Sequence, residues 1–283
     1  MSMPETRPVA APERLMQSKR GLIMGVANGH SIAWGIAKAL HAHGAELAFT
    51  FQGEALEKRV RPLAESLGAP LILPCDVEEK GAIETVFASI EKKWGGLDFA
   101  VHCIAYSDKS GLKGRYADTT RENFLRTMLI SAFSFTEMAR QAAPLMPQGG
   151  ALLTLTFEGA NRVMPNYNVM GIAKAALEAS VRYLAADFGP QGIRVNAISA
   201  GLVRTLAGAG IADGRVMFNY QKAHAPLRRN LDLADLGGAA VYLLSGLSSG
   251  VTGEIHYVDA GYNIVLMPHP ACLKADAAQN SQI

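Results

Sequence analysis

The chain alternates short apolar runs with longer stretches in which apolar residues recur every three or four positions. The short runs predict buried β-strands at 21–26, 46–51, 70–74, 98–104, 151–156, 193–198 and 254–258. The longer stretches predict helices, the clearest at 32–43, 54–67, 80–94, 167–188 and 233–244. Strands and helices in alternation are typical of βαβ units around a parallel sheet. We therefore predict an α/β fold, a single doubly wound domain with seven parallel strands.

The limits of this domain follow from where the pattern stops. Gly44, Gly68 and Gly95 follow predicted helices and serve as helix stops. Residues 1–17 and 268–283 carry neither pattern, so we expect mobile tails on either side of a domain at 18–267. Residues 202–230 form an irregular stretch that is long for a connection in a compact domain. We interpret this stretch as a substrate lid, helical in part.

Composition narrows the class of protein. A chain of 283 residues, 49% of them hydrophobic, can bury one large core. The formal charge of +2 comes from dispersed basic residues, which argues against a dedicated nucleic-acid binder. The three cysteines, Cys75, Cys103 and Cys272, have neither zinc-site nor disulfide-scaffold spacing, so we expect no metal and a reducing cytoplasm. The chain also has no uninterrupted apolar run of 18 residues, so we expect no membrane span and no export.

A tyrosine and a lysine are the most informative candidates for chemistry. Tyr167 and Lys174 lie seven residues apart within the predicted helix at 167–188. At roughly 100° per residue, seven steps make about two turns and place both side chains on one stripe. A phenol is a poor proton donor near neutrality unless a cation or dipole stabilises its anion, and Lys174 could supply that cation or hold a hydroxylated ligand. The alternative is an ordinary amphipathic helix with a half-buried Tyr and a solvated Lys.

A glycine-rich segment follows the first predicted strand. It begins at Gly25, includes Gly29 and Ser31, and leads through Ile32 and Gly35 into the first helix. Small residues let a backbone approach a pyrophosphate, and the helix N-terminus favours its negative charge. This position predicts a Rossmann-type dinucleotide site, although the segment departs from the stricter Gly-x-Gly-x-x-Gly pattern. The alternative is a turn that only packs the helix on the sheet.

The ends of the second and third strands bear on the choice of dinucleotide. Gln52 stands where an acidic residue would bind the ribose of NAD and an arginine would accept the 2′-phosphate of NADP. A neutral amide favours NADH over NADPH, because the nearest cations, Lys58 and Arg59, lie about one and a half helical turns away. Asp76 either accepts a hydrogen bond from the adenine amino group or caps the next helix.

These segments resemble the short-chain dehydrogenase/reductases, and within them the NADH-dependent enoyl-(acyl carrier protein) reductases of bacterial fatty-acid synthesis. The resemblance runs from about residue 18 to 264 and is carried by the motifs at 25–37, 46–52, 76–77, 165–174 and 194–206. Most short-chain reductases place the Lys four residues after the Tyr, whereas this family places it seven after. In this chain Gly171 occupies the usual Lys position.

The resemblance implies roles for individual residues. Tyr167 faces the thioester carbonyl and Lys174 holds the nicotinamide ribose. Asp76 and Val77 hold adenine, and Ile104 and residues 203–207 border nicotinamide. The cofactor set it implies is Gly25, Ser31, Ile32, Gln52, Asp76, Val77, Ile104, Lys174, Val203, Arg204, Thr205, Leu206 and Ala207. For the acyl chain we expect a slot lined by Tyr106, Ser107, Phe157, Tyr167, Met170, Ala207 and Ile211. Tyr106 and Ile211 are equally compatible with core packing.

Two positions depart from the family pattern. Phe157 stands where the family usually carries a second catalytic-site Tyr, and Glu158 follows where an apolar residue is common. Phe157 can wall a pocket but cannot donate a hydrogen bond. Leu202 stands where a proline is usual, and the loss of that ring loosens the start of the lid because proline fixes φ.

The reaction implied is reduction by NADH of the trans-2 double bond of an enoyl thioester, with Tyr167 as donor to the thioester oxygen. The resemblance also implies an acyl carrier protein partner and a homotetramer with an interface on the helix that begins near Tyr167. An acidic carrier protein could meet Arg204, Lys222, Arg228 and Arg229 around the lid, although scattered cations are usually solvated surface. One alternative is a carbonyl or 3-oxoacyl thioester reductase of the same superfamily. The other is a non-catalytic nucleotide-binding paralogue, since fold alone does not establish function.

Overall fold

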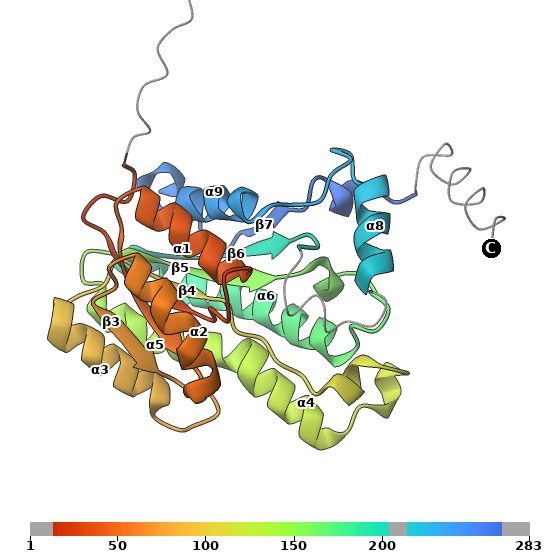
Figure 1. Ribbon diagram of the computed structural model, residues 1–283, viewed down its shortest axis with the longest axis horizontal. Helices are drawn as coiled ribbons and strands as arrows, with labels where there is room; N and C mark the ends of the chain where they lie inside the picture. Colours follow the sequence, from red (N-terminus) through yellow and green to blue (C-terminus); the bar gives the residue numbers. More distant parts are fainter. Residues whose placement is uncertain (1–13, 204–213, 268–283) are drawn as a thin grey trace, which may run out of the picture.

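A computed structural model describes residues 14–203 and 214–267 of the chain (Figure 1). Its strands are β1 (Arg20–Met24), β2 (Glu46–Phe51), β3 (Leu71–Pro74), β4 (Phe99–His102), β5 (Gly150–Thr156), β6 (Ile193–Ala200) and β7 (Ile255–Val258). They form one sheet in the order β3-β2-β1-β4-β5-β6-β7. All six pairings between neighbours are parallel. The predicted seven-stranded parallel sheet is confirmed.

Helices cover both faces of this sheet. They are α1 (Ile32–Ala42), α2 (Gly53–Ser66), α3 (Ala82–Trp94), α4 (Arg121–Met128), α5 (Ser134–Ala142), α6 (Val169–Phe188), α8 (Gly214–His224) and α9 (Leu233–Leu244). Buried side chains of α1, α2 and α9 share one apolar cluster, and those of α3, α5 and α6 share the other. In Figure 1, α1 and α9 lie above the sheet, and α3 and α5 lie below it. This is the doubly wound, Rossmann-type arrangement expected from the sequence.

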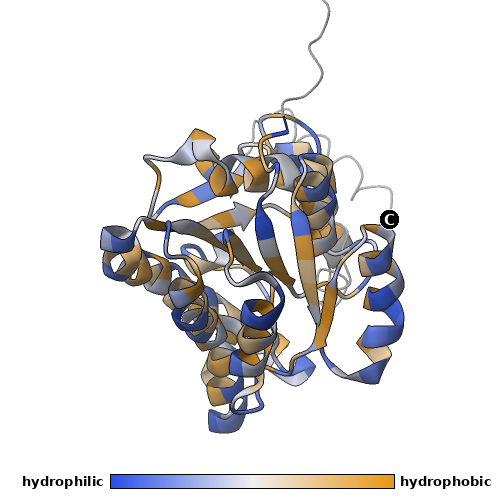
Figure 2. Ribbon diagram, turned by 90° about the vertical axis from the view of Figure 1, so that its left-hand side faces the viewer, coloured by the Kyte–Doolittle hydropathy of each residue, from blue (hydrophilic) through white to orange (hydrophobic). Residues whose placement is uncertain are grey.

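The central strands form because both of their faces are buried. Leu22, Ile23 and Met24 of β1 are fully buried, and successive side chains point to opposite faces. A parallel strand covered on both faces is apolar along its length instead of alternating with polar residues. Figure 2 shows the hydrophobic colour concentrated in the strands and the hydrophilic colour on outward turns of the helices.

Helices α1 and α9 approach each other closely because each carries a glycine at the contact, Gly35 on α1 and Gly237 on α9. A Cβ added to Gly35 would lie 2.7 Å from the Cβ of Leu233. Such a contact is sterically forbidden, so any side chain at 35 would separate the helices. Gly35 therefore belongs to a helix–helix contact, not to the phosphate-facing part of the glycine-rich segment.

Some element boundaries differ from those predicted. The helix expected at 167–188 begins at Val169, and the one expected at 80–94 begins at Ala82. Within the irregular stretch 202–230, residues 214–224 form α8. Helices α4 and α5, joined by the π-helical turn Leu129–Phe133, were not among the predicted helices. Residues 15–18, most of which belong to the expected N-terminal tail, form a turn that packs Met16 into the core.

Other expectations fall on parts of the chain that the structure does not describe. These are Arg204, Thr205, Leu206, Ala207, Ile211, Cys272 and the tail at 268–283. In the described ranges, Cys75 and Cys103 are free thiols. Within those same ranges, no helix has the length and apolar character needed to cross a bilayer.

A histidine at the end of β4 is buried in the middle of the sheet. The Nε2 of His102 lies 2.8 Å from the Ser134 hydroxyl, and its Nδ1 lies 3.1 Å from the Thr154 hydroxyl. The Ser134 hydroxyl donates to the Ile130 carbonyl, so it is available to accept from an Nε2–H. Burial, with a smaller contribution from Lys174, lowers the pKa of His102 to about 3. His102 is therefore neutral in the folded protein at physiological pH.

Acidification is expected to destabilise the fold through His102. Its pKa is about 3 in the folded state against 6.5 for an unperturbed histidine, so the unfolded chain binds the proton more tightly. This contribution is present above about pH 6.5 and is lost as the pH falls towards 3, at a cost of about 2 kcal/mol by pH 5. Urea unfolding at pH 7 and pH 5 measures it. A His102→Gln variant should lose this part of the pH dependence, whereas replacing the exposed His41 should retain it; equal pH dependence in both variants would contradict the assignment.

Candidate active site

The loop after β1 passes unusually close to the end of β4. Gly25 has a φ of 97°, and an added Cβ would lie 2.2 Å from the backbone oxygen of Cys103. Only glycine allows both the backbone angle and this approach. The close contact directs the loop across the carboxyl end of the sheet, the edge where doubly wound folds bind ligands.

Ser31 orders the same loop at the N-terminus of α1. Its hydroxyl accepts the backbone N–H groups of Ala27 and Asn28, each at 3.0 Å. It also lies 3.4 Å from the side-chain oxygen of Asn28. Helix α1 begins at the next residue, Ile32, so the positive end of the helix dipole faces this loop. The arrangement can receive a phosphate, as the sequence predicted for Gly25, Ser31 and Ile32.

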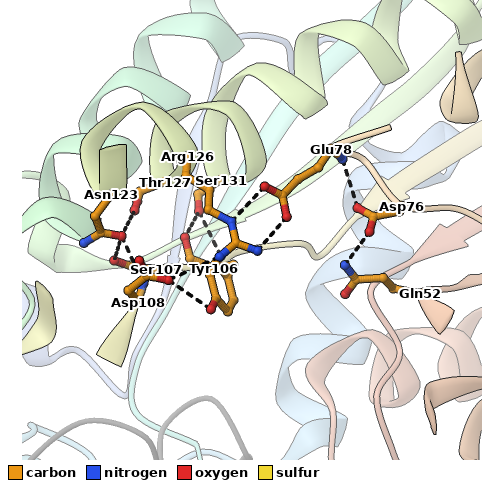
Figure 3. Close-up of polar contacts among 10 residues, drawn as sticks. All are labelled: Gln52, Asp76, Glu78, Tyr106, Ser107, Asp108, Asn123, Arg126, Thr127 and Ser131. Atoms are coloured by element: carbon orange, nitrogen blue, oxygen red, sulfur yellow. Dashed lines mark hydrogen bonds and ion pairs between the residues drawn. The ribbon is translucent and has the colours of Figure 1, made fainter. Parts of the chain in front are cut away.

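Gln52 and Asp76 meet at the ends of β2 and β3. The Nε2 of Gln52 donates to Oδ2 of Asp76 at 2.9 Å, and the backbone N–H of Glu78 donates to the other oxygen at 3.0 Å (Figure 3). Helix α3 begins only at Ala82, with Gly81 as its N-cap. The alternative that Asp76 caps this helix is therefore wrong. Val77, the next residue, is buried. The carboxylate of Asp76 and the apolar side chain of Val77 therefore lie next to each other at this edge of the sheet.

Tyr167 lies in a turn just before α6, which corrects the prediction of a helix from 167. The residues on either side of it, Asn166 and Asn168, have positive φ values of 61° and 42°. Asparagine tolerates this region better than most residues. The Asn168 amide donates to the carbonyls of Gly111 at 3.2 Å and Gly114 at 3.3 Å. The turn is thus tied to the loop after β4, and the two-turn helical spacing argued for Tyr167 and Lys174 does not apply.

The ring of Tyr167 is held by packing. It is 9% exposed and meets Phe157 edge-on, with ring centroids 5.1 Å apart. A Cβ added to Gly159 would lie 2.5 Å from this ring, so the chain has room for Tyr167 only because residue 159 is glycine. Burial, followed by the charge of Glu178, raises the pKa of Tyr167 well above its usual value. The phenol therefore stays protonated near neutrality and can donate its proton to a ligand.

Lys174 is buried in the second turn of α6, with only 6% of its surface exposed. Its ammonium donates to the backbone carbonyl of Leu155 on β5 at 2.7 Å. Burial lowers the pKa of Lys174 to about 8, while Cys103 and Glu178 raise it. One hydrogen bond leaves two of the three ammonium protons available to a ligand.

Glu178 is a buried acid that the sequence analysis missed. Its carboxylate accepts the Thr156 hydroxyl at 2.7 Å and the Asn161 amide at 3.3 Å. It raises the pKa of both Tyr167 and Lys174. Its spacing of four residues from Lys174 places the two on one helix face, and that spacing was the available signal.

An apolar cavity opens beside Phe157. Its volume is about 540 Å³, and it lies between the segment 157–165, the end of β6, helix α8 and residues 259–266. Among its lining residues are Phe157, Glu158, Arg162, Leu202, Gln221 and Val265. Tyr167 packs against Phe157, one of these lining residues. The structure thus brings together two residues of the predicted acyl slot.

The other described members of the predicted slot, Tyr106, Ser107 and Met170, do not line the cavity beside Phe157. The Ser131 hydroxyl accepts the backbone N–H of Tyr106 at 2.9 Å and lies 3.7 Å from the sulfur of Met170. Ser107 is buried and donates to the Asn123 side-chain oxygen at 3.3 Å. The side chain of Tyr106 is 43% exposed, and its hydroxyl donates to Asp108. Its ring therefore does not wall the cavity beside Phe157.

Arg126 joins the two loops that precede α3 and α4. It pairs with both oxygens of Glu78 at 2.8 Å and with Asp108 at 3.3 Å, and its guanidinium lies 4.6 Å from the centre of the Tyr106 ring (Figure 3). The Asp76–Glu78 loop is thereby tied to the Tyr106–Asp108 loop. These partners are 48 and 18 residues away in the chain, so no local pattern could have revealed the contact.

A second cavity of about 490 Å³ borders the loop after β1. Val203 and His30 both line it, together with Lys222 and Arg229 of the predicted basic set. Arg229 pairs with Asp235 at 2.6 Å, so its charge is partly neutralised. Val203 therefore lies near the phosphate-facing loop. Ile104, in contrast, packs against the apolar cluster on the other face of the sheet, which α3, α5 and α6 share. In that described part, no group of His, Cys, Asp and Glu is arranged to hold a metal ion.

Comparisons with known proteins agree with this geometry. The family model described as enoyl-(acyl carrier protein) reductase matches residues 25–263. An NADH enoyl-(acyl-carrier-protein) reductase of Rhizobium meliloti, the second of that organism, is 66% identical over 264 residues, which cover 93% of this chain and 98% of the relative.

Solved structures of the same kind superpose on the fold. The crystal structure of FabI from Candidatus Liberibacter asiaticus has a TM-score of 0.89 at 57% identity, covering 91% of this chain and 100% of the other. The enoyl-(acyl-carrier-protein) reductase of Anaplasma phagocytophilum, solved in complex with NAD, has a TM-score of 0.88 at 56% identity, covering 91% and 98%.

Proposed function

This chain belongs to the enoyl-(acyl carrier protein) reductase family, and we propose that it uses NADH to reduce the trans-2 double bond of enoyl thioesters in fatty-acid elongation. The observation that carries the proposal is the pair of buried groups at one edge of the sheet. Tyr167 is a protonated phenol packed on Phe157 beside the cavity of about 540 Å³. Lys174, seven residues later, is a buried ammonium held on Leu155.

The residues around the carboxyl edge fit a dinucleotide. Ser31 and the start of α1 would receive the phosphates, Gln52 and Asp76 the adenosine, and Lys174 the hydroxyls of the second ribose. When bound, NADH supplies the hydride. The carbonyl of Leu155 fixes where the ammonium of Lys174 stands, so Lys174 orients a ligand more than it transfers protons.

Tyr167 acts at the thioester oxygen. Hydride addition at the β-carbon pushes negative charge onto that oxygen, where a preorganised donor lowers the barrier. The resulting enolate then takes a proton from solvent at its α-carbon, which gives the saturated thioester. The raised pKa of Tyr167 keeps its proton available at neutral pH. Phe157 offers no hydroxyl, so in this chain Tyr167 carries the donor role without the second tyrosine that is usual in the family.

Gly171 argues against the carbonyl-reductase alternative. Enzymes of that type carry a lysine four residues after the tyrosine, which is position 171 here. A Cβ added to Gly171 would lie 2.7 Å from the carbonyl oxygen of Gly159. No lysine fits without displacing the backbone that holds Tyr167.

Comparing two thioesters tests the proposed function. Purified protein is supplied with NADH and either a crotonyl or an acetoacetyl thioester, and NADH consumption is followed by absorbance. The proposal expects turnover of the crotonyl substrate. Turnover of the acetoacetyl substrate alone would instead establish a 3-oxoacyl reductase, and NADH binding without turnover of either would establish a non-catalytic paralogue.

Cofactor preference is expected to respond to Gln52. At the proposed adenosine end of the site, the amide of Gln52 is hydrogen-bonded to Asp76, and neither side chain can neutralise a 2′-phosphate. A Gln52→Arg variant provides a guanidinium that binds phosphate, so the ratio of kcat/KM for NADH over NADPH should fall at least about tenfold. Gln191→Arg, on an exposed turn after α6, is the matched control. An unchanged ratio in Gln52→Arg would place the adenosine elsewhere.

Partners and assembly extend this proposal. Lys222 and Arg229 beside the second cavity, with Arg204 and Arg228, would meet an acidic acyl carrier protein. The family resemblance supports a cytoplasmic homotetramer. Tyr183 on α6 is 77% exposed, and Leu125 and Phe133 are also exposed. Such apolar surface is typical of interfaces and supports the proposal that α6 lies at a subunit contact.

A further inference from the structure

Leu202 introduces a backbone donor where the family resemblance expects a proline. Proline has no backbone N–H, whereas Leu202 has one, at a half-buried position just after β6. A donor taken out of water needs an acceptor. The N–H of Leu202 donates to Oε1 of Gln221 on α8 at 2.9 Å.

The Gln221 side chain is built into this place. It is only 3% exposed, and it lines the cavity of about 540 Å³. A Cβ added to Gly201 would lie 2.8 Å from Nε2 of Gln221, so the amide approaches the chain only because residue 201 is glycine. Over residues 14–203 and 214–267, Nε2 has no hydrogen-bond partner. The hydrogen bond that Oε1 accepts from Leu202 is therefore the contact that holds the side-chain amide of Gln221 in this buried place.

The hydrogen bond to Gln221 ties the segment after β6 to helix α8, and a second hydrogen bond ties the same segment to the sheet. The N–H of Gly201 donates to the carbonyl of Val258 on β7 at 2.8 Å. Leu202 thus follows a residue anchored to the sheet and is itself anchored to helix α8. The next residue, Val203, lines the second cavity beside His30 of the loop after β1.

We propose that Gln221 is a positioning residue that replaces the constraint of the absent proline ring by accepting the Leu202 N–H, and so sets Val203 at the dinucleotide side of the site. Proline restricts φ through its ring, whereas Gln221 restricts the same residue through a hydrogen bond to a helix. Leu202 and Gln221 act as a pair, since neither makes this contact without the other. The part of this proposal that concerns the cofactor rests on the proposed function.

A double-mutant cycle tests the pairing. Gln221→Leu removes the acceptor and is expected to raise the KM for NADH about three- to tenfold, while kcat changes less than twofold. In Leu202→Pro the backbone donor is absent and the ring restores the restriction. Gln221→Leu should therefore have almost no effect on this background, and the double variant should fall within twofold of the wild-type KM. Additive effects of the two changes would overturn the pairing.

Amide hydrogen exchange of Leu202, resolved to single residues in the substrate-free protein, tests the hydrogen bond independently of activity. Exchange should be about tenfold faster in Gln221→Leu. Gln221→Glu keeps an acceptor oxygen and should retain protection, which covers the case in which Gln221→Leu folds poorly. Unchanged exchange in Gln221→Leu would disprove the contact. A wild-type protein that protects Leu202 but reduces no enoyl thioester would disprove the proposed function and leave the contact standing.

Thr252→Val is the matched control. The Thr252 hydroxyl accepts the N–H of Val195 at 3.0 Å, a similar side-chain contact near the start of β6, at the end of the strand away from Leu202. Its loss should lower the Tm without changing the KM for NADH, and Leu202→Pro should not rescue it. If Thr252→Val raises the KM as much as Gln221→Leu does, the effect of Gln221 reflects general stability and the positioning role is wrong.

Discussion

Replacing Tyr167 with phenylalanine is expected to lower kcat for enoyl-thioester reduction by about 10²- to 10³-fold. The loss follows from the removal of one preorganised donor to the oxygen on which charge develops. The ring and its edge-on contact with Phe157 remain, so the Kd for NADH and the Tm should change little. Stopped-flow measurement of NADH oxidation under saturating substrate gives kcat, and calorimetry gives the Kd.

Two variants control this experiment. Tyr116→Phe makes the same chemical change at a side chain that is 47% exposed, and it should leave kcat unchanged. Phe157→Tyr restores the hydroxyl that is usual in the family. The centroid of the ring at position 157 lies 5.1 Å from that of the Tyr167 ring. If Tyr167→Phe retains wild-type kcat, the donor is another group, and rescue of that variant by Phe157→Tyr would show that the two positions are interchangeable.

Replacing Lys174 with methionine is expected to raise the KM for NADH by about ten- to a hundredfold. A hydrogen bond from a charged donor contributes about 1.5–3 kcal/mol, which corresponds to this range. Methionine has a similar length and fills the buried space, although it leaves the Leu155 carbonyl without the ammonium. Lys92→Met, at an exposed position on α3, is the matched control and should have no effect.

The pH dependence of NADH binding provides a second signature of Lys174. Its pKa of about 8 in the folded protein lies below the 10.5 of an unperturbed lysine, because burial disfavours the charge. The ammonium is therefore present below about pH 8 and is lost as the pH rises through that value. Affinity for NADH should fall above pH 8 in the wild type and stay flat in Lys174→Met. A parallel fall in both proteins would assign the titration to another group.

The same shift has the opposite sign for stability. The unfolded chain holds the Lys174 proton up to about pH 10.5 and the folded chain only up to about pH 8. Burial of the ammonium thus lowers the free energy of unfolding by its full amount below pH 8. This loss becomes smaller as the pH rises towards 10.5. Keeping a buried ammonium at the expense of stability is typical of functional sites.

The sheet was predictable because its strands are short apolar runs that do not fit a helix. The segment between β4 and β5 was not, since α4 is largely polar and a π-helical turn separates it from α5. Tyr167 was placed in a helix because the apolar pattern of α6 continues through it. The positive φ of Asn166 and Asn168 ends that helix earlier, and no pattern of hydrophobic residues encodes such angles.

The candidate site was predictable where a residue follows a strand directly. Gln52 and Asp76 end neighbouring strands, so their contact at 2.9 Å follows from the order of the sheet. Gln221, Glu178 and Arg126 escaped prediction for a different reason. Each is a polar residue on a helix that ordinarily faces solvent, and its role arises from a partner brought near only by tertiary packing.

The fate of the hydride is the most direct test of enoyl reduction by this protein. The protein is supplied with a trans-2-enoyl thioester and with NADH that carries deuterium at both C4 positions of the nicotinamide, and the product is analysed by mass spectrometry and NMR. We expect a saturated acyl thioester with one deuterium at its β-carbon. Recovery of the enoyl thioester unchanged, without deuterium, from a protein that demonstrably binds NADH would contradict it.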